Sequence, residues 1–126
     1  MPGRAPLDER RKFPRATVHV HVQFYSLDGK HGGPPLLGIT RDISAGGLAI
    51  EIPSFFATEN LMPPEGSQVL VRFTLPDVPK AFKIPSRVAW TWNPPPTGMG
   101  VEFLSISDQD RTLIAEFVEQ YYQQGP

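Results

Sequence analysis

Residues 36–52, Leu-Leu-Gly-Ile-Thr-Arg-Asp-Ile-Ser-Ala-Gly-Gly-Leu-Ala-Ile-Glu-Ile, decide the fold. Apolar residues flank a polar centre that contains a glycine pair, which is typical of two strands joined by a turn. In the second half the apolar residues alternate with others, so that half has one buried face. We therefore expect strands over 36–41 and 48–52, with a turn over 42–47 at the bend of a hairpin.

The same alternation recurs on both sides of this hairpin. Valines and a phenylalanine occupy every second position of 17–24, between polar residues. Similar patterns predict further strands over 69–75, 82–93 and 98–103. Fifteen prolines and eleven glycines suit short strands joined by turns.

The end of the chain has helical spacing instead. Ser107 is placed as an N-cap, and Asp110 follows three residues later in a capping-box-like position. Apolar residues then form one stripe, which predicts a helix over 107–122. Six strands and a closing helix predict an all-β fold with one C-terminal helix, arranged as a small six-stranded antiparallel barrel over 16–106.

Composition excludes several classes of protein. A chain of 126 residues is one domain, and without cysteine it has no disulfide framework and no thiolate zinc site. A net charge of −1 argues against a long nucleic acid as partner. No apolar run approaches the roughly 20 residues of a membrane span, and residues 1–8 lack the apolar core of a signal peptide. We expect a cytoplasmic protein with no membrane insertion.

Residues 1–15 are basic and have no apolar period, so we expect a flexible N-terminal arm. A basic arm on a nearly neutral chain suggests a small anionic ligand. Arg11 and Arg15 supply guanidiniums, which make forked hydrogen bonds to phosphate and to the O6/N7 edge of guanine. Asp42 supplies a carboxylate, which accepts hydrogen bonds from the other guanine edge. These are the groups that a guanine nucleotide requires.

The same residues carry a family resemblance. Arg11 and Arg15 match the motif RxxxR, and Asp42, Ser44 and Gly47 match (D/N)xSxxG. With a glycine-flanked segment over 98–103, the chain resembles the PilZ domain family over residues 9–122. The resemblance implies a six-stranded barrel with a C-terminal helix that acts as a receptor for the second messenger cyclic di-GMP.

The resemblance also implies roles for single residues. Arg11 and Arg15 bind phosphates and guanine edges, and Asp42 and Ser44 bind guanine and fix the bound geometry. Gly46 and Gly47 allow a turn backbone that a side chain would block. Arg10, directly before the motif, resembles family members that bind a stacked ligand pair, which implies two cyclic di-GMP molecules per chain.

Plainer interpretations stay open for the other conspicuous residues. His19 and His21 lie two apart on one strand face, as a metal pair would, but no third ligand is evident, so we expect no metal. Trp90 and Trp92 are in phase and could stack on bases, although a sheet face or partner contact is favoured. No catalytic triad or carboxylate-rich metal cluster is visible, so we expect no enzyme.

Two functions compete. The leading one is a cyclic di-GMP receptor, whose arm becomes ordered on the ligand and whose changed surface acts on a protein partner in trans, in motility or biofilm formation. The alternative is a PilZ-like adaptor in type IV pilus or motility machinery that works without the ligand. Either could be a monomer or a homodimer.

Overall fold

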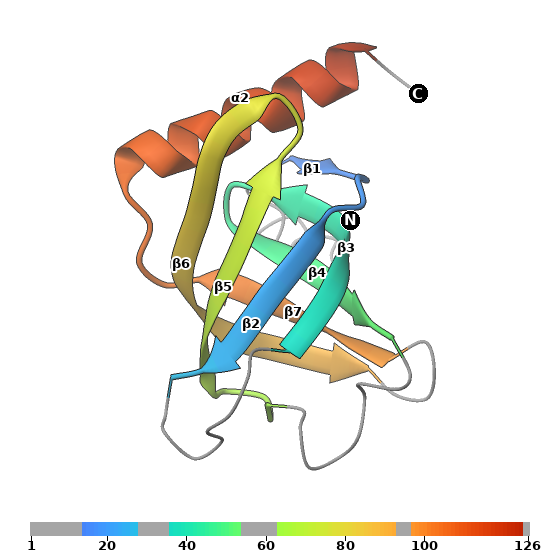
Figure 1. Cartoon of the computed structure of the whole chain (residues 1–126), viewed down its shortest axis with the longest axis vertical. Coiled ribbons are helices and arrows are strands. Elements are labelled where there is room, and N and C mark those ends of the chain that lie inside the picture. The colour runs from blue at the N-terminus through green and yellow to red at the C-terminus, as the bar shows by residue number, and fades with distance from the viewer. Residues whose placement is uncertain (1–13, 28–35, 54–62, 93–96, 125–126) are drawn as a thin grey trace, which may run out of the picture.

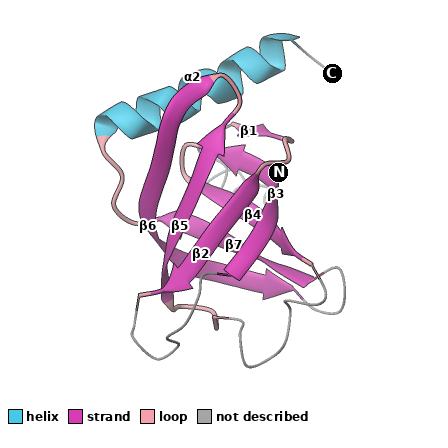
Figure 2. Cartoon of the chain, viewed as in Figure 1, coloured by secondary structure: helices cyan, strands magenta, loops and turns pink. Residues whose placement is uncertain are grey.

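The computed structural model describes residues 14–27, 36–53, 63–92 and 97–124. Within these ranges the chain forms strands and one C-terminal helix (Figures 1 and 2). The elements are β1 (Arg15–Ala16), β2 (His21–Ser26), β3 (Leu36–Ser44), β4 (Gly47–Ile52), β5 (Gln68–Leu75), β6 (Val78–Trp92), β7 (Thr97–Phe103) and α2 (Asp108–Gln124).

Six of these strands close into an antiparallel barrel, which confirms the predicted fold class. The order around the sheet is β3-β2-β5-β6-β7-β4, and β4 pairs again with β3 to complete the ring. The short β1 pairs with the far end of β3, beyond the end of β2. The chain therefore enters the barrel beside the β3–β4 hairpin.

Alternate residues of the strands fill the barrel. On β5 the inward positions are Val69, Val71, Phe73 and Leu75, and the residues between them face outward. The ring of Phe73 stacks on that of Phe82 from β6 at a centroid distance of 5.2 Å. Period-two patterning thus yields one apolar core, as the sequence predicts.

Helix α2 covers one end of the barrel, next to β1 (Figure 1). Ser107 Oγ accepts a hydrogen bond from the Asp110 backbone nitrogen at 3.0 Å, which confirms the predicted N-cap. Ile114 and Val118 are buried against the barrel. No helix in the described part of the chain is long and apolar enough to cross a membrane.

The strand predicted over 17–24 begins later than its sequence pattern suggests. Only residues from His21 onward pair as strand β2. Before them, the side chain of Thr40 takes the place of strand pairing. The buried Thr40 hydroxyl donates to the Val18 carbonyl at 2.7 Å and accepts from the Val20 nitrogen at 2.9 Å. A side chain thus satisfies backbone groups that a neighbouring strand would otherwise satisfy.

The turn predicted over 42–47 is shorter than expected. Strand β3 continues through Asp42 to Ser44, which pairs directly with Gly47. Only Ala45 and Gly46 connect the two strands. Asp42 therefore stands on a strand, where its side chain has a fixed direction, and not in a loop.

Candidate functional site

A hollow of about 510 Å³ lies on the outer face of the barrel beside the β3–β4 hairpin. It is lined by residues that are far apart in the sequence, namely Arg15, Thr17, His19, Arg41, Asp42, Ala49, Trp90 and Trp92. These side chains include two guanidiniums, one carboxylate and two indoles. The hollow thus combines charged groups with flat aromatic surfaces.

Two β-bulges turn the key side chains toward this hollow. On β3, Thr40 faces the core and pairs with Ile50 of β4. Asp42, two residues later, pairs with Ala49, which is only one residue from Ile50 on β4. Arg41 is therefore an extra residue that reverses the alternation, so Asp42 faces outward although it lies two positions after the buried Thr40.

Strand β6 contains the second bulge. Val88 is buried and pairs with Val101, while Trp90 pairs with Gly100. Ala89 is the extra residue on this strand. Without it, Trp90 would continue the inward series that Val88 belongs to. Both bulges re-aim side chains onto the same outer face.

The strand registers bring the carboxylate and the indole into one row. Asp42 pairs with Ala49, Ala49 with Gly100, and Gly100 with Trp90. The two residues between Asp42 and Trp90 are small, which leaves the surface between them low. Three residues of this row, Asp42, Ala49 and Trp90, line the hollow.

The glycines of β7 provide room for the tryptophans. A Cβ at Gly100 would lie 2.2 Å from Cε2 of Trp90, and a Cβ at Gly98 would lie 2.1 Å from Cζ2 of Trp92. The indole rings therefore lie directly over the glycine backbone. The two rings are 4.7 Å apart between centroids and tilted by 31°. Together they present an aromatic surface beside the row.

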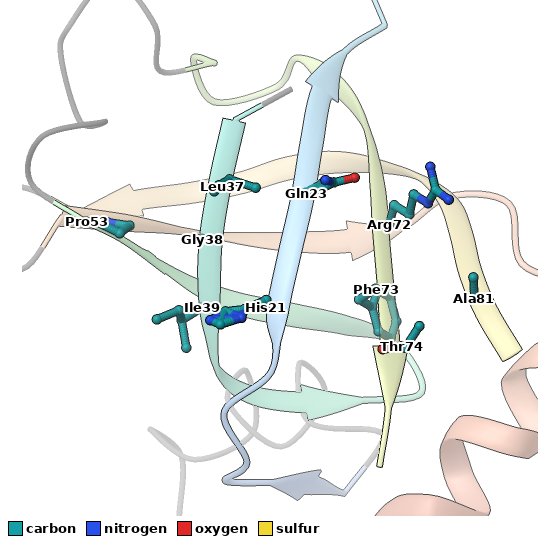
Figure 3. Close-up of a pocket in the computed structure, with 10 residues that line it drawn as sticks. All are labelled: His21, Gln23, Leu37, Gly38, Ile39, Pro53, Arg72, Phe73, Thr74 and Ala81. Atoms are coloured by element: carbon teal, nitrogen blue, oxygen red, sulfur yellow. The ribbon is translucent and has the colours of Figure 1, made fainter. Parts of the chain in front are cut away.

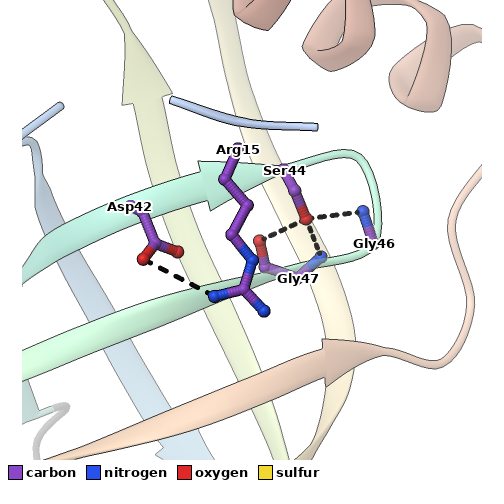
Figure 4. A network of polar contacts seen from close by, with 5 residues as sticks. All are labelled: Arg15, Asp42, Ser44, Gly46 and Gly47. Atoms are coloured by element: carbon purple, nitrogen blue, oxygen red, sulfur yellow. Dashed lines mark hydrogen bonds and ion pairs between the residues drawn. The ribbon is translucent and has the colours of Figure 1, made fainter. Parts of the chain in front are cut away.

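Arg15 and Asp42 form an ion pair at one wall of the hollow (Figure 4). The Arg15 Nη1 atom is 3.7 Å from Asp42 Oδ2, and both side chains are partly exposed. The contact arises because β1 pairs Arg15 with Ser44, two residues beyond Asp42. Both groups remain open to a ligand from the solvent side.

Ser44 holds the tight turn that follows (Figure 4). Its Oγ accepts hydrogen bonds from the Gly46 nitrogen at 3.1 Å and the Gly47 nitrogen at 3.2 Å, and it lies 3.3 Å from the Gly47 carbonyl oxygen, to which it donates. The side chain is buried. The hydroxyl therefore satisfies the backbone of the turn.

Gly47 is required by close packing. A Cβ at this position would lie 2.1 Å from the Val101 carbonyl oxygen of β7. Among the described glycines only Gly66 has a left-handed backbone, with φ of 87°. Glycine is thus needed at position 47, as predicted, but the reason is the short distance between β4 and β7 and not an unusual backbone angle.

Arg41 and His19 complete the hollow. The guanidinium carbon of Arg41 lies 5.6 Å from the centroid of the Trp92 ring, within the range of a cation–π contact. His19 Nδ1 is 2.9 Å from the Thr40 carbonyl oxygen, which can only accept, so this nitrogen carries the proton. The imidazole is therefore fixed at the wall beside the ion pair.

The family follows from comparison with known proteins. The model of the PilZ domain family matches residues 9–120, most of the chain. This chain belongs to the PilZ domain family. No curated protein matches the chain.

Solved structures share the PilZ fold at low sequence identity. The Bacillus subtilis inhibitor of motility, MotI/DgrA, is 18% identical with a TM-score of 0.74, over 91% of this chain and 52% of that one. This chain thus spans about half the length of MotI/DgrA. The PilZ domain of YcgR from Escherichia coli, solved with c-di-GMP, is 14% identical with a TM-score of 0.68, over 91% and 93% of the two chains.

A third PilZ structure, from Xanthomonas campestris, is tetrameric and assembles through a helical bundle. It is 11% identical to this chain with a TM-score of 0.65, and 98% of each chain is covered. These likenesses establish the fold. PilZ domains are regulatory binding domains.

The two PilZ motifs meet in space as far as the structure describes them. Arg15 and Asp42 line the hollow together, while Ser44, Gly46 and Gly47 shape the turn next to it. Arg10 and Arg11 lie outside the described residues. The remaining lining residues are not part of either motif.

Trp90 and Trp92 line the hollow together with Asp42, which the sequence alone does not predict. Their alternation is evident, but it does not reveal that they face the acidic motif. The glycines at 98 and 100 are the available signal, because a strand that carries glycine at alternate positions leaves room for large rings from its neighbour. Among the described residues, no three metal-ligating side chains come together, and the two histidines line different hollows.

Proposed function

We propose that this PilZ domain binds cyclic di-GMP in the hollow between the β3–β4 hairpin and the tryptophan pair. One observation carries the proposal: Arg15, Asp42 and the two indoles line the same hollow. Cyclic di-GMP contains two guanines and two phosphates, so it needs cations, acceptors and flat surfaces together. The structure of the YcgR PilZ domain with c-di-GMP supports the choice of ligand.

Each group has a matching chemical role. The Arg15 guanidinium donates to a phosphate or to the O6/N7 edge of guanine, and Arg41 offers a second guanidinium nearby. The Asp42 carboxylate accepts from the N1 and N2 hydrogens of guanine. A guanine ring stacks on the indole surface of Trp90 and Trp92.

The resemblance implies that Ser44 binds guanine, whereas we propose that it acts by positioning and makes no direct ligand contact. Its hydroxyl is engaged with the backbone of the turn at Gly46 and Gly47. A fixed turn holds the end of β3, and with it Asp42, in place before the ligand arrives. Preformed geometry lowers the entropy cost of binding.

Arg10 and Arg11 supply the remaining cations, and two cyclic di-GMP molecules bind per chain. On ligand binding, the arm becomes ordered against the barrel, starting from Arg15, which β3 already holds. Backbone relaxation measured by NMR with and without ligand tests this step. Equal mobility of residues 4–13 in both states would contradict it.

The ordered arm changes the surface that a partner protein meets, so the output acts in trans. MotI/DgrA, which shares the fold, is an inhibitor of motility, and this makes motility the first process to examine. The alternative is an adaptor that works without cyclic di-GMP. The retained charges of Arg15 and Asp42 favour the receptor.

Calorimetric titration with cyclic di-GMP tests the proposal. We expect binding by the wild type with two ligands per chain, and one ligand or none for Arg10→Ala. Asp42→Ala should weaken binding about ten- to hundredfold, because a charge-assisted hydrogen bond contributes about 1.5–3 kcal/mol. GTP and GMP serve as competitors for nucleotide specificity. Absence of binding would leave the adaptor as the function.

A further inference from the structure

A second hollow, of about 630 Å³, lies on another part of the outer barrel surface, over β2, β3 and β5 (Figure 3). Leu37 and Ile39 stand on one side of it, and Arg72 rises from the other (Figure 3). None of the residues that line it is acidic. The PilZ motifs do not include any of these residues.

Two large apolar side chains are exposed at this hollow. Leu37 is 41% exposed and Ile39 is 37% exposed, both on the outward face of β3. Isolated exposed apolar residues are ordinary, but a pair beside a hollow offers a contact area for another molecule.

Two positive charges extend the same face. Strand register aligns Leu37 with Gln23, Gln23 with Arg72, and Arg72 with Lys83. Arg72 and Lys83 thus lie directly opposite each other on the neighbouring strands β5 and β6, where like charges repel each other. Neither has an ion-pair partner among the residues that the structure describes.

An unfavourable pair of cations beside apolar side chains is complementary to an acidic, partly apolar ligand. Carboxylates placed between Arg72 and Lys83 would remove the repulsion. An apolar side chain next to those carboxylates would cover Leu37 and Ile39. Both the cations and the exposed apolar side chains of this face would then have partners.

We propose that this face docks an acidic segment of a partner protein. One apolar side chain of the segment enters the hollow beside Leu37 and Ile39, and its carboxylates pair with Arg72 and Lys83. The proposal rests on the proposed function in one respect, since it supplies the surface through which the receptor acts in trans.

A protein fits this face better than a membrane or a nucleic acid. Membrane binding needs apolar side chains that protrude into the lipid, whereas these two border a hollow. A long nucleic acid needs many phosphate contacts, and this chain has a net charge of −1.

The two hollows are connected through β3. This strand carries Leu37 and Ile39 at one end and Asp42 at the other, with the buried Thr40 between them. The hydroxyl of Thr40 forms hydrogen bonds with the backbone of residues 18 and 20. These residues lie on either side of His19, which lines the hollow proposed for cyclic di-GMP. The docking face therefore shares its supporting strand with the nucleotide site.

The test uses a fluorescein-labelled peptide of alternating glutamate and leucine, titrated with the full chain and followed by anisotropy. A peptide with lysine in place of glutamate is the charge control. We expect saturable binding of the acidic peptide alone. The double variant Arg72→Gln/Lys83→Gln should weaken it at least about tenfold, and Leu37→Ser should weaken it as well.

Gln68→Glu is the matched control variant. It lowers the net charge by one, half the change in the double variant, and it lies on the exposed face of β5 outside the hollow. We expect it to bind the peptide as the wild type does. Thermal melts confirm that all variants fold.

Calorimetry with cyclic di-GMP separates this proposal from the proposed function. Peptide binding that depends on Arg72 and Lys83 supports the docking face even if cyclic di-GMP does not bind. No binding of the acidic peptide, or equal binding by the double variant, overturns the proposal. Flotation with phosphatidylserine vesicles that depends on both cations, without peptide binding, would overturn it in favour of a membrane surface.

Discussion

Trp90 of β6 lies directly over Gly100 of β7, so close that a single methyl group at position 100 would be 2.2 Å from the indole ring. Gly100 is also the neighbour of Ala49, which pairs with Asp42. One row of residues across four strands thus links the acidic motif to the aromatic surface. The position of the indole relative to the carboxylate therefore depends on the glycine between them.

Gly100→Ala should weaken cyclic di-GMP binding although Gly100 touches no ligand in our account. The added methyl group displaces the Trp90 ring, which has no room above a larger residue. The circular dichroism of the tryptophan pair reports the displacement directly. Unchanged dichroism together with wild-type affinity would contradict the assigned role of the glycine.

Replacing Trp90 by alanine should reduce cyclic di-GMP affinity by about 1–3 kcal/mol, the range for loss of one stacked base. Trp90→Phe should retain a large part of the affinity, because it keeps an aromatic face. Calorimetry provides both values, and a thermal melt checks the fold. If Trp90→Ala and Trp92→Ala both bind like the wild type, the aromatic surface has no part in binding.

Breaking the Arg15–Asp42 pair should affect binding far more than stability. A partly exposed ion pair contributes about 0–1 kcal/mol to folding, so Arg15→Ala should melt close to the wild type. Its affinity for cyclic di-GMP should fall about tenfold or more, because a charge-assisted bond is lost. Calorimetry and a thermal melt on the same preparation measure the two effects.

The pair Arg87–Glu102 offers the matched control, since it is also a partly exposed ion pair and lies outside the hollow. Arg87→Ala should leave the affinity unchanged. Equal losses of affinity in Arg15→Ala and Arg87→Ala would point to a general charge effect and not to a site.

Ile114→Ala should destabilise the domain by about 2–5 kcal/mol, the usual cost of truncating a fully buried isoleucine. Urea unfolding measures the change. Glu116→Ala, on the exposed side of the same helix, should change stability by less than about 0.5 kcal/mol. Similar values for the two variants would mean that α2 is not packed on the barrel as described.

Most of the strands and the helix could be predicted from the sequence because their patterns are local, but β1 (Arg15–Ala16) is not predicted and β6 begins at Val78, before the predicted residue 82. Alternating apolar residues mark β5 and β7 to within one residue, and Ser107 marks the start of α2 correctly. The barrel follows from the number of strands and from the family resemblance.

The composition of the site could be predicted only in part, because a two-residue alternation in the sequence gives no sign of where a β-bulge occurs. Arg41 and Ala89 each shift the phase of a strand by one residue, and these shifts decide that Asp42 and Trp90 face the same side. The predicted start of β2 is wrong for a similar reason, since the Thr40 side chain takes over hydrogen bonds that alternation assigns to a strand.

Amide and indole NMR spectra offer the most direct test of the cyclic di-GMP site. The chain has two tryptophans, and both line the hollow, so a titration reads the site through two indole N–H signals. We expect both signals, with the Asp42 amide, to shift saturably as cyclic di-GMP is added. Indole signals that stay in place at saturating ligand would contradict this expectation.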